Sequence, residues 1–235
     1  MVGVRQAKRA LVVMAHPDDI DFWGVGTVIG WIRQGWQVSY ALVSDGGAGG
    51  VPGVGQQRRQ EQLTAAELAG VEAVSFFDGY LDGQIAATPA LVKDVSRVIR
   101  QLQPARVLTQ SPVRNWSDIR LTHPDHLAVG EAVVQAVYPA ARNPYAFPEL
   151  LADEGLEPWV VTELWLQGDP TPNRVVDVTN TFPEREAAVL AHASQHPDLG
   201  QARRRLRQDL ATCAAKAGLP DGHYAEAFNV VQITY

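Results

Sequence analysis

The chain has 235 residues, 46% of them hydrophobic, which is enough to bury one sizeable core and fits a single α/β domain over residues 1–235. Its formal net charge of -6 argues against a nucleic-acid partner, because phosphate binding requires a clustered surplus of Lys and Arg. Cys213 is the one cysteine and cannot form an internal disulfide, and no run approaches the ~18 apolar residues of a membrane span, so we expect a cytoplasmic protein without one.

The predicted elements of the first half alternate between strands and helices. Leu11 to Met14 is a continuous apolar run, typical of a strand buried on both faces of a parallel sheet. A helix is predicted next, over residues 20–34, and Gly35 ends it. The following segments are predicted, in order, as a strand (38–43), a glycine-rich loop (45–55), a helix (58–69), a strand (73–77), a helix (90–102) and a strand (106–110).

The second half continues the alternation after an irregular segment, residues 111–122. Helices are predicted at about 124–137, 184–193 and 202–217, and strands at 159–166, 175–178 and 228–233. Strands alternating with helices indicate βαβ units. The sequence therefore predicts a single-domain, Rossmann-like, three-layer α/β fold with a mostly parallel central sheet and helices on both faces. In such sheets, sites form at the carboxyl ends of strands where the strand order reverses.

Two histidine motifs follow predicted parallel strands. His16-Pro17-Asp18-Asp19 comes after the first strand, and His123-Pro124-Asp125-His126 comes after the fourth. A catalytic zinc ion takes three protein ligands from His, Asp or Glu and keeps one position open for water. The two motifs together can supply that number.

The spacing within these motifs suggests a role for each side chain. A histidine and a carboxylate three residues apart across a strand-to-turn junction can reach one metal ion, so His16 and Asp19 are predicted ligands. Asp18, between them, is the expected general base. His126 is expected to complete the metal shell, and His123 to stabilise the oxyanion or protonate the leaving nitrogen.

Each motif also has a purely structural interpretation. His-Pro-Asp is common in turns, where the aspartate caps a helix, so Asp19 or Asp125 could be an N-cap and nothing more. In the metal-site interpretation, the Asp125 carboxylate orients His123 and raises its pKa. A third copy, His196-Pro197-Asp198, follows a helix rather than a buried strand, and we interpret it as a turn. The placement of the other two copies after βαβ strands favours a metal site.

These motifs resemble those of the LmbE-like, or PIG-L, family, which includes the N-acetylglucosaminyl-phosphatidylinositol de-N-acetylases and the deacetylases of mycothiol and bacillithiol synthesis. Ala15 to Asp19 matches the signature Ala-His-Pro-Asp-Asp, and His123 to His126 matches His-Pro-Asp-His. The resemblance implies one Zn²⁺ per chain and the same ligand, base and acid assignments that the spacing suggests.

The likeness covers nearly the whole chain. Arg58 to Glu61 is similar to the family's Arg-x-x-Glu helix and Asp82-Gly83 to its Asp-Gly turn, which implies that Arg58 and Asp82 bind substrate hydroxyls. Ala191 to Gln195 resembles a late motif, in which His192 either supports the site or is a satisfied buried histidine.

The resemblance implies zinc-dependent hydrolysis of the N-acetyl group of an amino-sugar conjugate, releasing acetate and a free amine. Ser44-Asp45-Gly46-Gly47 stands where many members carry Thr-x-Gly-Glu, which leaves the identity of the substrate open. A metal-dependent amidase or esterase acting on another acylated small molecule, such as a thiol conjugate or natural product, would use the same residues. A non-catalytic binding protein would have no need of the base, and Asp18 is present. Whether the chain forms a homo-oligomer is open as well.

A dinucleotide-binding domain is a further alternative, suggested by Gly24-Val25-Gly26 and Gly30. Its glycine turn should follow the first strand at once, whereas His16 to Phe22 intervenes here. Close packing of a helix therefore explains these glycines better.

Overall fold

A seven-stranded sheet with the order β3-β2-β1-β4-β5-β7-β6 runs through the residues that the computed structural model describes, 8–117 and 119–233. The strands are Arg9–Met14 (β1), Gln37–Leu42 (β2), Ala73–Phe76 (β3), Arg106–Gln110 (β4), Glu163–Gln167 (β5), Arg174–Asp177 (β6) and Ala225–Gln232 (β7). The pairs from β3 through β5 are parallel, and β7 is antiparallel to both β5 and β6. The predicted mostly parallel α/β fold is confirmed.

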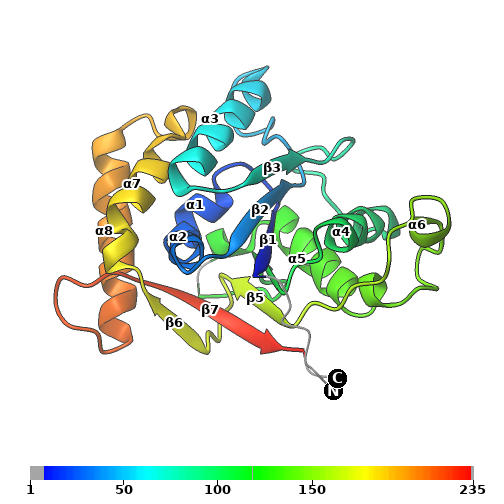
Figure 1. Cartoon of the computed structure of the whole chain (residues 1–235). Helices are drawn as coiled ribbons and strands as arrows, with labels where there is room; N and C mark the ends of the chain where they lie inside the picture. The colour runs from blue at the N-terminus through cyan, green and yellow to red at the C-terminus, as the bar shows by residue number, and fades with distance from the viewer. Residues whose placement is uncertain (1–7, 118, 234–235) are drawn as a thin grey trace.

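Helices cover both faces of this sheet (Figure 1). The α-helices of the described residues are Asp19–Trp23 (α1), Val25–Arg33 (α2), Val54–Ala69 (α3), Pro89–Leu102 (α4), Pro124–Val137 (α5), Glu149–Ala152 (α6), Phe182–Leu190 (α7) and Leu199–Lys216 (α8). Side chains alternate along a strand, so Leu11 and Val13 of β1 pack with α4 and α5, whereas Val12 and Met14 pack with α2. None of these helices, within the described residues, is long and apolar enough to cross a membrane.

The predicted helix over residues 20–34 is divided at Gly24 into α1 and α2. The division lets the buried Glu226 carboxylate accept hydrogen bonds from the backbone N–H groups of Gly26 and Thr27 at the start of α2. A Cβ on Gly26 would lie 2.8 Å from that carboxylate and 2.9 Å from Val178. The expected close packing is confirmed for Gly26 but is wrong for Gly30, where a Cβ would meet no atom of the described residues within 4 Å.

Several further boundaries differ from the prediction, among them the starts of α3, β5, β7 and α8. The strand expected from Trp159 begins only at Glu163, whose register partner Arg106 is the first residue of β4. Helix α8 begins at Leu199 rather than Ala202, with the Asp198 side chain accepting from the backbone N–H of Gln201 as its N-cap. The interpretation of the third His-Pro-Asp copy as a turn is confirmed.

The order of the strands in the sheet brings the two histidine motifs to the same place. The chain runs from β1 outward to β3, then returns to lay β4 against the opposite side of β1. The carboxyl ends of β1 and β4 are therefore neighbours at the point where the order reverses. His16 follows β1, and α5 with its histidines follows the segment after β4.

Candidate active site

Three predicted metal ligands meet at the carboxyl end of β1. The Asp19 carboxylate accepts a hydrogen bond from the backbone N–H of His16, and the same oxygen lies 3.3 Å from His16 Nδ1. Its other oxygen lies 3.1 Å from Nε2 of His126, which the first turn of α5 supplies. The structure thus brings His16, Asp19 and His126 together from segments more than a hundred residues apart.

The separations fit a shared divalent cation. Two donor atoms that are each about 2.0–2.1 Å from a tetrahedral ion stand roughly 3.3 Å apart, close to both distances measured from Asp19. The nearest ring nitrogens of His16, His123 and His126 also lie within 4.8 Å of one another. Two imidazoles and a carboxylate are a suitable donor set for zinc.

The charges around His16 favour a cation as well. Burial alone would lower the pKa of His16, but the carboxylates of Asp19 and Asp82 outweigh it and raise the pKa to about 11. Burial would raise the pKa of Asp19, but His126 and His16 hold it well below the usual range. The space between these groups therefore stabilises positive charge.

The other ring nitrogen of His16, Nε2, faces two further carboxylates. Nε2 lies 2.9 Å from Asp82 Oδ1 and 3.2 Å from Asp125 Oδ2. Both carboxylates also accept backbone N–H groups, Asp82 from Ala48 and Asp125 from Gly83. A proton on Nε2 satisfies them and leaves the Nδ1 lone pair on the side of Asp19.

The role predicted for Asp125 needs a correction. The fully buried Asp125 carboxylate lies 3.2 Å from His16 Nε2. The group of Asp125 that contacts His123 is its backbone N–H, which donates to Nδ1 at 3.3 Å. Burial and the charges of His16 and His126 lower the pKa of His123, outweighing the raising effect of Asp125. Because Nδ1 accepts a hydrogen bond, neutral His123 carries its proton on Nε2.

Asp18 has an unusual backbone and a perturbed carboxyl group. Its φ of 85° lies in the left-handed region, which is strained for a residue with a Cβ. Burial and repulsion from Asp19 raise the pKa of Asp18 to about 7, although Arg58 Nη2, 3.3 Å from the carboxylate, acts in the opposite direction. A carboxyl group of this pKa suits a general base near neutral pH.

A buried line of polar side chains holds the Asp18 backbone. The Asp18 N–H donates to Gln62 Oε1 at 2.9 Å, and Gln62 Nε2 donates to Asp21 Oδ2 at 2.9 Å. His192 Nε2 lies 2.8 Å from that Asp21 oxygen. Gln62, Asp21 and His192 are all completely buried. His192 is thus a buried histidine with a hydrogen-bond partner that also connects to the site.

The sequence prediction missed Gln62 and Gln110. Gln110 ends β4, where its Nε2 donates to Asp19 Oδ2 at 2.7 Å and its Oε1 accepts from the Ala15 N–H. A signal existed for each: Gln62 stands one helical turn after Arg58, and Gln110 is the polar last residue of a buried strand.

Arg58 and Asp82, the predicted substrate-binding residues, both border the site. Arg58 is 5% exposed and donates to the carbonyl oxygens of Pro17 and Gly46 at 2.7 and 2.8 Å. A Cβ on Gly46 would lie 2.3 Å from its guanidinium, which explains a glycine in this loop. Arg58 thereby ties the loop to the turn that carries Asp18, and substrate contact by either residue stays a prediction.

Comparisons with known proteins agree with this arrangement. A family model described as PIG-L, GlcNAc-PI de-N-acetylase, matches residues 11–137. Diacetylchitobiose deacetylase of Thermococcus kodakarensis is 29% identical over 231 residues, which cover 95% of this chain and 83% of the relative. The solved N,N'-diacetylchitobiose deacetylase of Pyrococcus horikoshii superposes with a TM-score of 0.86 at 26% identity, covering 96% of this chain and 84% of that one.

A second solved structure shares the fold alone. GalB, a 4-carboxy-2-hydroxymuconate hydratase from Pseudomonas putida KT2440, has a TM-score of 0.77 at 23% identity, with 97% of this chain and 98% of that chain covered. The architecture therefore also occurs in a protein named for different chemistry, so the assignment of a reaction depends on the side chains of the site.

Proposed function

Because the chain belongs to the PIG-L family, described as GlcNAc-PI de-N-acetylase, we propose that it hydrolyses the N-acetyl amide of an amino-sugar conjugate, releasing acetate and a free amine. One observation carries the proposal: Asp19 faces His16 and His126 at 3.3 and 3.1 Å, with the Asp18 carboxyl group next to them. The deacetylases to which the chain is similar act on diacetylchitobiose by name, which supports an N-acetylglucosamine conjugate as the substrate.

The proposed cofactor is one Zn²⁺ per chain, held by His16, Asp19 and His126. Two other sets of three possible ligands share His16: one adds His123 and His126, and the other adds Asp82 and Asp125. We favour the set with Asp19, because this residue lies within 3.3 Å of a ring nitrogen of both His16 and His126, whereas Asp82 and Asp125 face His16 Nε2 and can accept its proton. They would then support the ligand rather than bind the ion.

The residues around the cation have separate roles in amide hydrolysis. When bound, the ion supplies Lewis acidity, which polarises the amide carbonyl and makes water more acidic. Asp18 accepts a proton from the attacking water, and its pKa near 7 suits that step. His123 donates from Nε2 to the developing oxyanion. The C–N bond then breaks, the proton taken by Asp18 passes to the leaving nitrogen, and acetate and the free amine result.

The buried groups support this division. Arg58 fixes one Asp18 oxygen while bonding the carbonyl of Pro17, so the base carboxylate is held beside the turn. Gln62 accepts a hydrogen bond from the strained Asp18 backbone. Both contacts are formed before substrate arrives, which lowers the reorganisation that catalysis requires.

We also propose a cytoplasmic location and a single domain for this protein. A cytoplasmic location is supported by the presence of a single cysteine, which leaves no internal disulfide to form. A single domain over residues 1–235 is supported by the continuous sheet that joins early and late strands.

The test is a turnover assay on zinc-loaded protein with matched amide and ester substrates. Diacetylchitobiose and a second N-acetylglucosamine conjugate serve as amides, and an aryl acetate serves as the ester. We expect free amine and acetate to appear in equal amounts from the amides, and the Asp18→Asn variant to lose both. A His223→Asn variant is the control, since His223 pairs with Asp177 away from the site. Faster turnover of the ester than of every amide would overturn the proposed substrate class.

A further inference from the structure

A cavity lies beside the candidate active site, between α1, α8 and the start of β7. Its volume is about 390 Å³, within the range of small-molecule sites. Much of its lining is apolar or weakly polar, from the side chains of Phe22, Trp23, Leu206, Leu210, Cys213 and Ala227. Neither the metal ligands nor the proposed mechanism uses this cavity.

The cavity adjoins the metal ligands through Trp23. Trp23 and Gly168 line both the cavity and a small crevice that His126 and Gln110 also line. Trp23 ends α1, the helix that Asp19 begins, and its side chain is 37% exposed. Trp23 and Gly168 therefore separate the cavity from the crevice beside the metal ligands.

The ionised side chains around the cavity are paired with one another or with neighbours, although Arg185 Nη1 is buried without a hydrogen-bond partner among the residues that the structure describes. Arg185 and Glu226 form a fully buried ion pair at 2.6 Å. Arg205 lies 3.6 Å from Asp209, one turn further along α8. Asp169, at the mouth, accepts from Ser111 Oγ at 2.7 Å. An uncharged apolar group would leave these pairs intact and contact the apolar part of the lining.

We propose that this cavity is a substrate subsite for an uncharged apolar group, with Trp23 as the wall that it shares with the metal centre. An engineered cavity of about 150 Å³ admits benzene, so this one admits a larger group such as an octyl chain or a naphthyl ring. The inference rests on the proposed function and extends its substrate from N-acetyl to N-acyl amino-sugar conjugates. That group is either the aglycone or an acyl chain longer than acetyl.

Cys213 provides a binding test that needs no turnover. It is the one cysteine of the chain and lines the cavity. Burial raises the pKa of the Cys213 thiol, so its alkylation by iodoacetamide is followed at mildly alkaline pH. We expect the octyl glycoside of N-acetylglucosamine, or N-octanoylglucosamine, to slow the alkylation several-fold, and the methyl glycoside to leave it unchanged. Equal rates with all three compounds would overturn the proposal.

Kinetics then identify which part of the substrate enters the cavity. One series lengthens the aglycone and keeps the acetyl group, and the other lengthens the acyl chain on a methyl glycoside. We expect KM to fall about tenfold along one of the two series, as burial of apolar surface provides. A flat KM along both series would contradict the subsite.

Filling the cavity should abolish this preference. In Leu210→Trp the larger ring occupies the cavity, so KM for the octyl substrate should rise about tenfold while KM for the methyl glycoside stays the same. Leu199→Trp is the matched control, since Leu199 is an exposed residue of the same helix. If Leu210→Trp folds poorly, wild-type protein alkylated at Cys213 with N-phenylmaleimide provides the same filling. A retained octyl preference in the filled protein would overturn the proposal.

The apolar subsite and the deacetylase activity can be tested separately. Hydrolysis of the methyl glycoside without any octyl effect would remove the subsite and keep the proposed function. Protection of Cys213 by the octyl compounds, without amide hydrolysis, would keep the subsite and remove the deacetylase assignment.

Discussion

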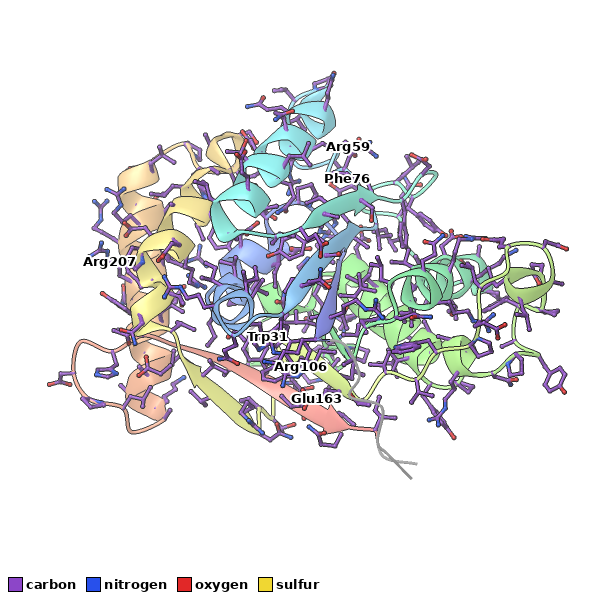
Figure 2. All side chains as sticks on the ribbon, viewed as in Figure 1. Trp31, Arg59, Phe76, Arg106, Glu163 and Arg207 are labelled. Atoms are coloured by element: carbon purple, nitrogen blue, oxygen red, sulfur yellow. The ribbon has the colours of Figure 1, made fainter. Side chains whose placement is uncertain are left out.

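Charged side chains lie at both ends of the sheet, but their arrangement differs between the amino end and the carboxyl end. At the amino end, Arg106 of β4 pairs with Glu163 of β5 at 2.5 Å, and its guanidinium lies 3.9 Å from the ring centroid of Trp36. Trp31 lies beside the same pair, as Figure 2 shows. At the carboxyl end, Asp19 and its neighbour Asp18 stand beside His16, with further carboxylates behind it.

The difference lies in how the charges compensate. At the amino end, the single cation Arg106 pairs with the single anion Glu163 and packs against aromatic rings, an arrangement that stabilises the fold. At the carboxyl end, burial and repulsion from Asp19 raise the pKa of Asp18 to about 7, while His126 and His16 hold the pKa of Asp19 low. Ionisable groups pushed in opposite directions are characteristic of catalytic sites. Changes at the carboxyl end should therefore affect catalysis, and changes at the amino end should affect stability.

The largest effect is expected from Asp18→Asn. The amide cannot accept the proton of the attacking water, so kcat should fall by about 10² to 10⁴ with the zinc content unchanged. Steady-state kinetics and elemental analysis of the same preparation measure both quantities. A kcat within a factor of two of the wild type would show that Asp18 is not the base.

Asp125→Asn should act through the metal ligand. The variant weakens the acceptor that holds the His16 Nε2 proton, so zinc affinity should fall about 10- to 100-fold, the usual cost of losing such support. Zinc titration against a competing chelator measures the change. Affinity equal to that of the wild type would mean that the Asp125 carboxylate does not orient His16.

Gln62→Ala should affect kcat with little change in KM or zinc binding. It removes the acceptor for the Asp18 N–H and frees the strained turn, for which we expect about a tenfold loss of kcat. Gln56→Ala is the control, because Gln56 is an exposed residue of the same helix. A loss confined to KM would argue that Gln62 contacts substrate instead of positioning the base.

At the amino end, Arg106→Ala should reduce stability without changing catalysis. Loss of the ion pair and of the aromatic contacts should lower the free energy of unfolding by about 1–2 kcal/mol. Urea unfolding reports the change, and kcat per folded molecule should stay at the wild-type value. A fall in kcat would break the division between the two ends.

Glu163→Gln should show the smallest effect, and one that depends on pH. Burial would raise the pKa of Glu163, but hydrogen bonds from Trp165 and Arg106 outweigh it and hold the pKa below its ordinary value of 4.5. The ionised form therefore contributes stability above pH 4.5, and that contribution is lost as the pH falls through the lower folded-state value. The difference in unfolding free energy between wild type and variant should shrink in acid. A difference that is constant from neutral pH into this acid range would contradict the ion pair's role.

The sequence predicted the fold class and the meeting of His16, Asp19 and His126 because both follow from local pattern and chain order. Buried strands have a distinctive composition, and parallel strands place their carboxyl ends at one edge. Asp125 was misjudged for a physical reason: its closeness to His123 in the chain gave no indication that its side chain turns inward to His16. The break at Gly24 was equally hidden, because it depends on Glu226 at the far end of the chain.

The most direct test of the account is zinc binding by metal-free protein, measured by titration against a competing chelator. We predict one equivalent for the wild type, and losses beyond the 10- to 100-fold typical of supporting residues for His16→Ala, Asp19→Ala and His126→Ala. Asp82→Ala should lose less than any of these three. Wild-type affinity in the Asp19 or His126 variant, together with complete loss in the Asp82 variant, would contradict the central claim and move the ion to the other side of His16.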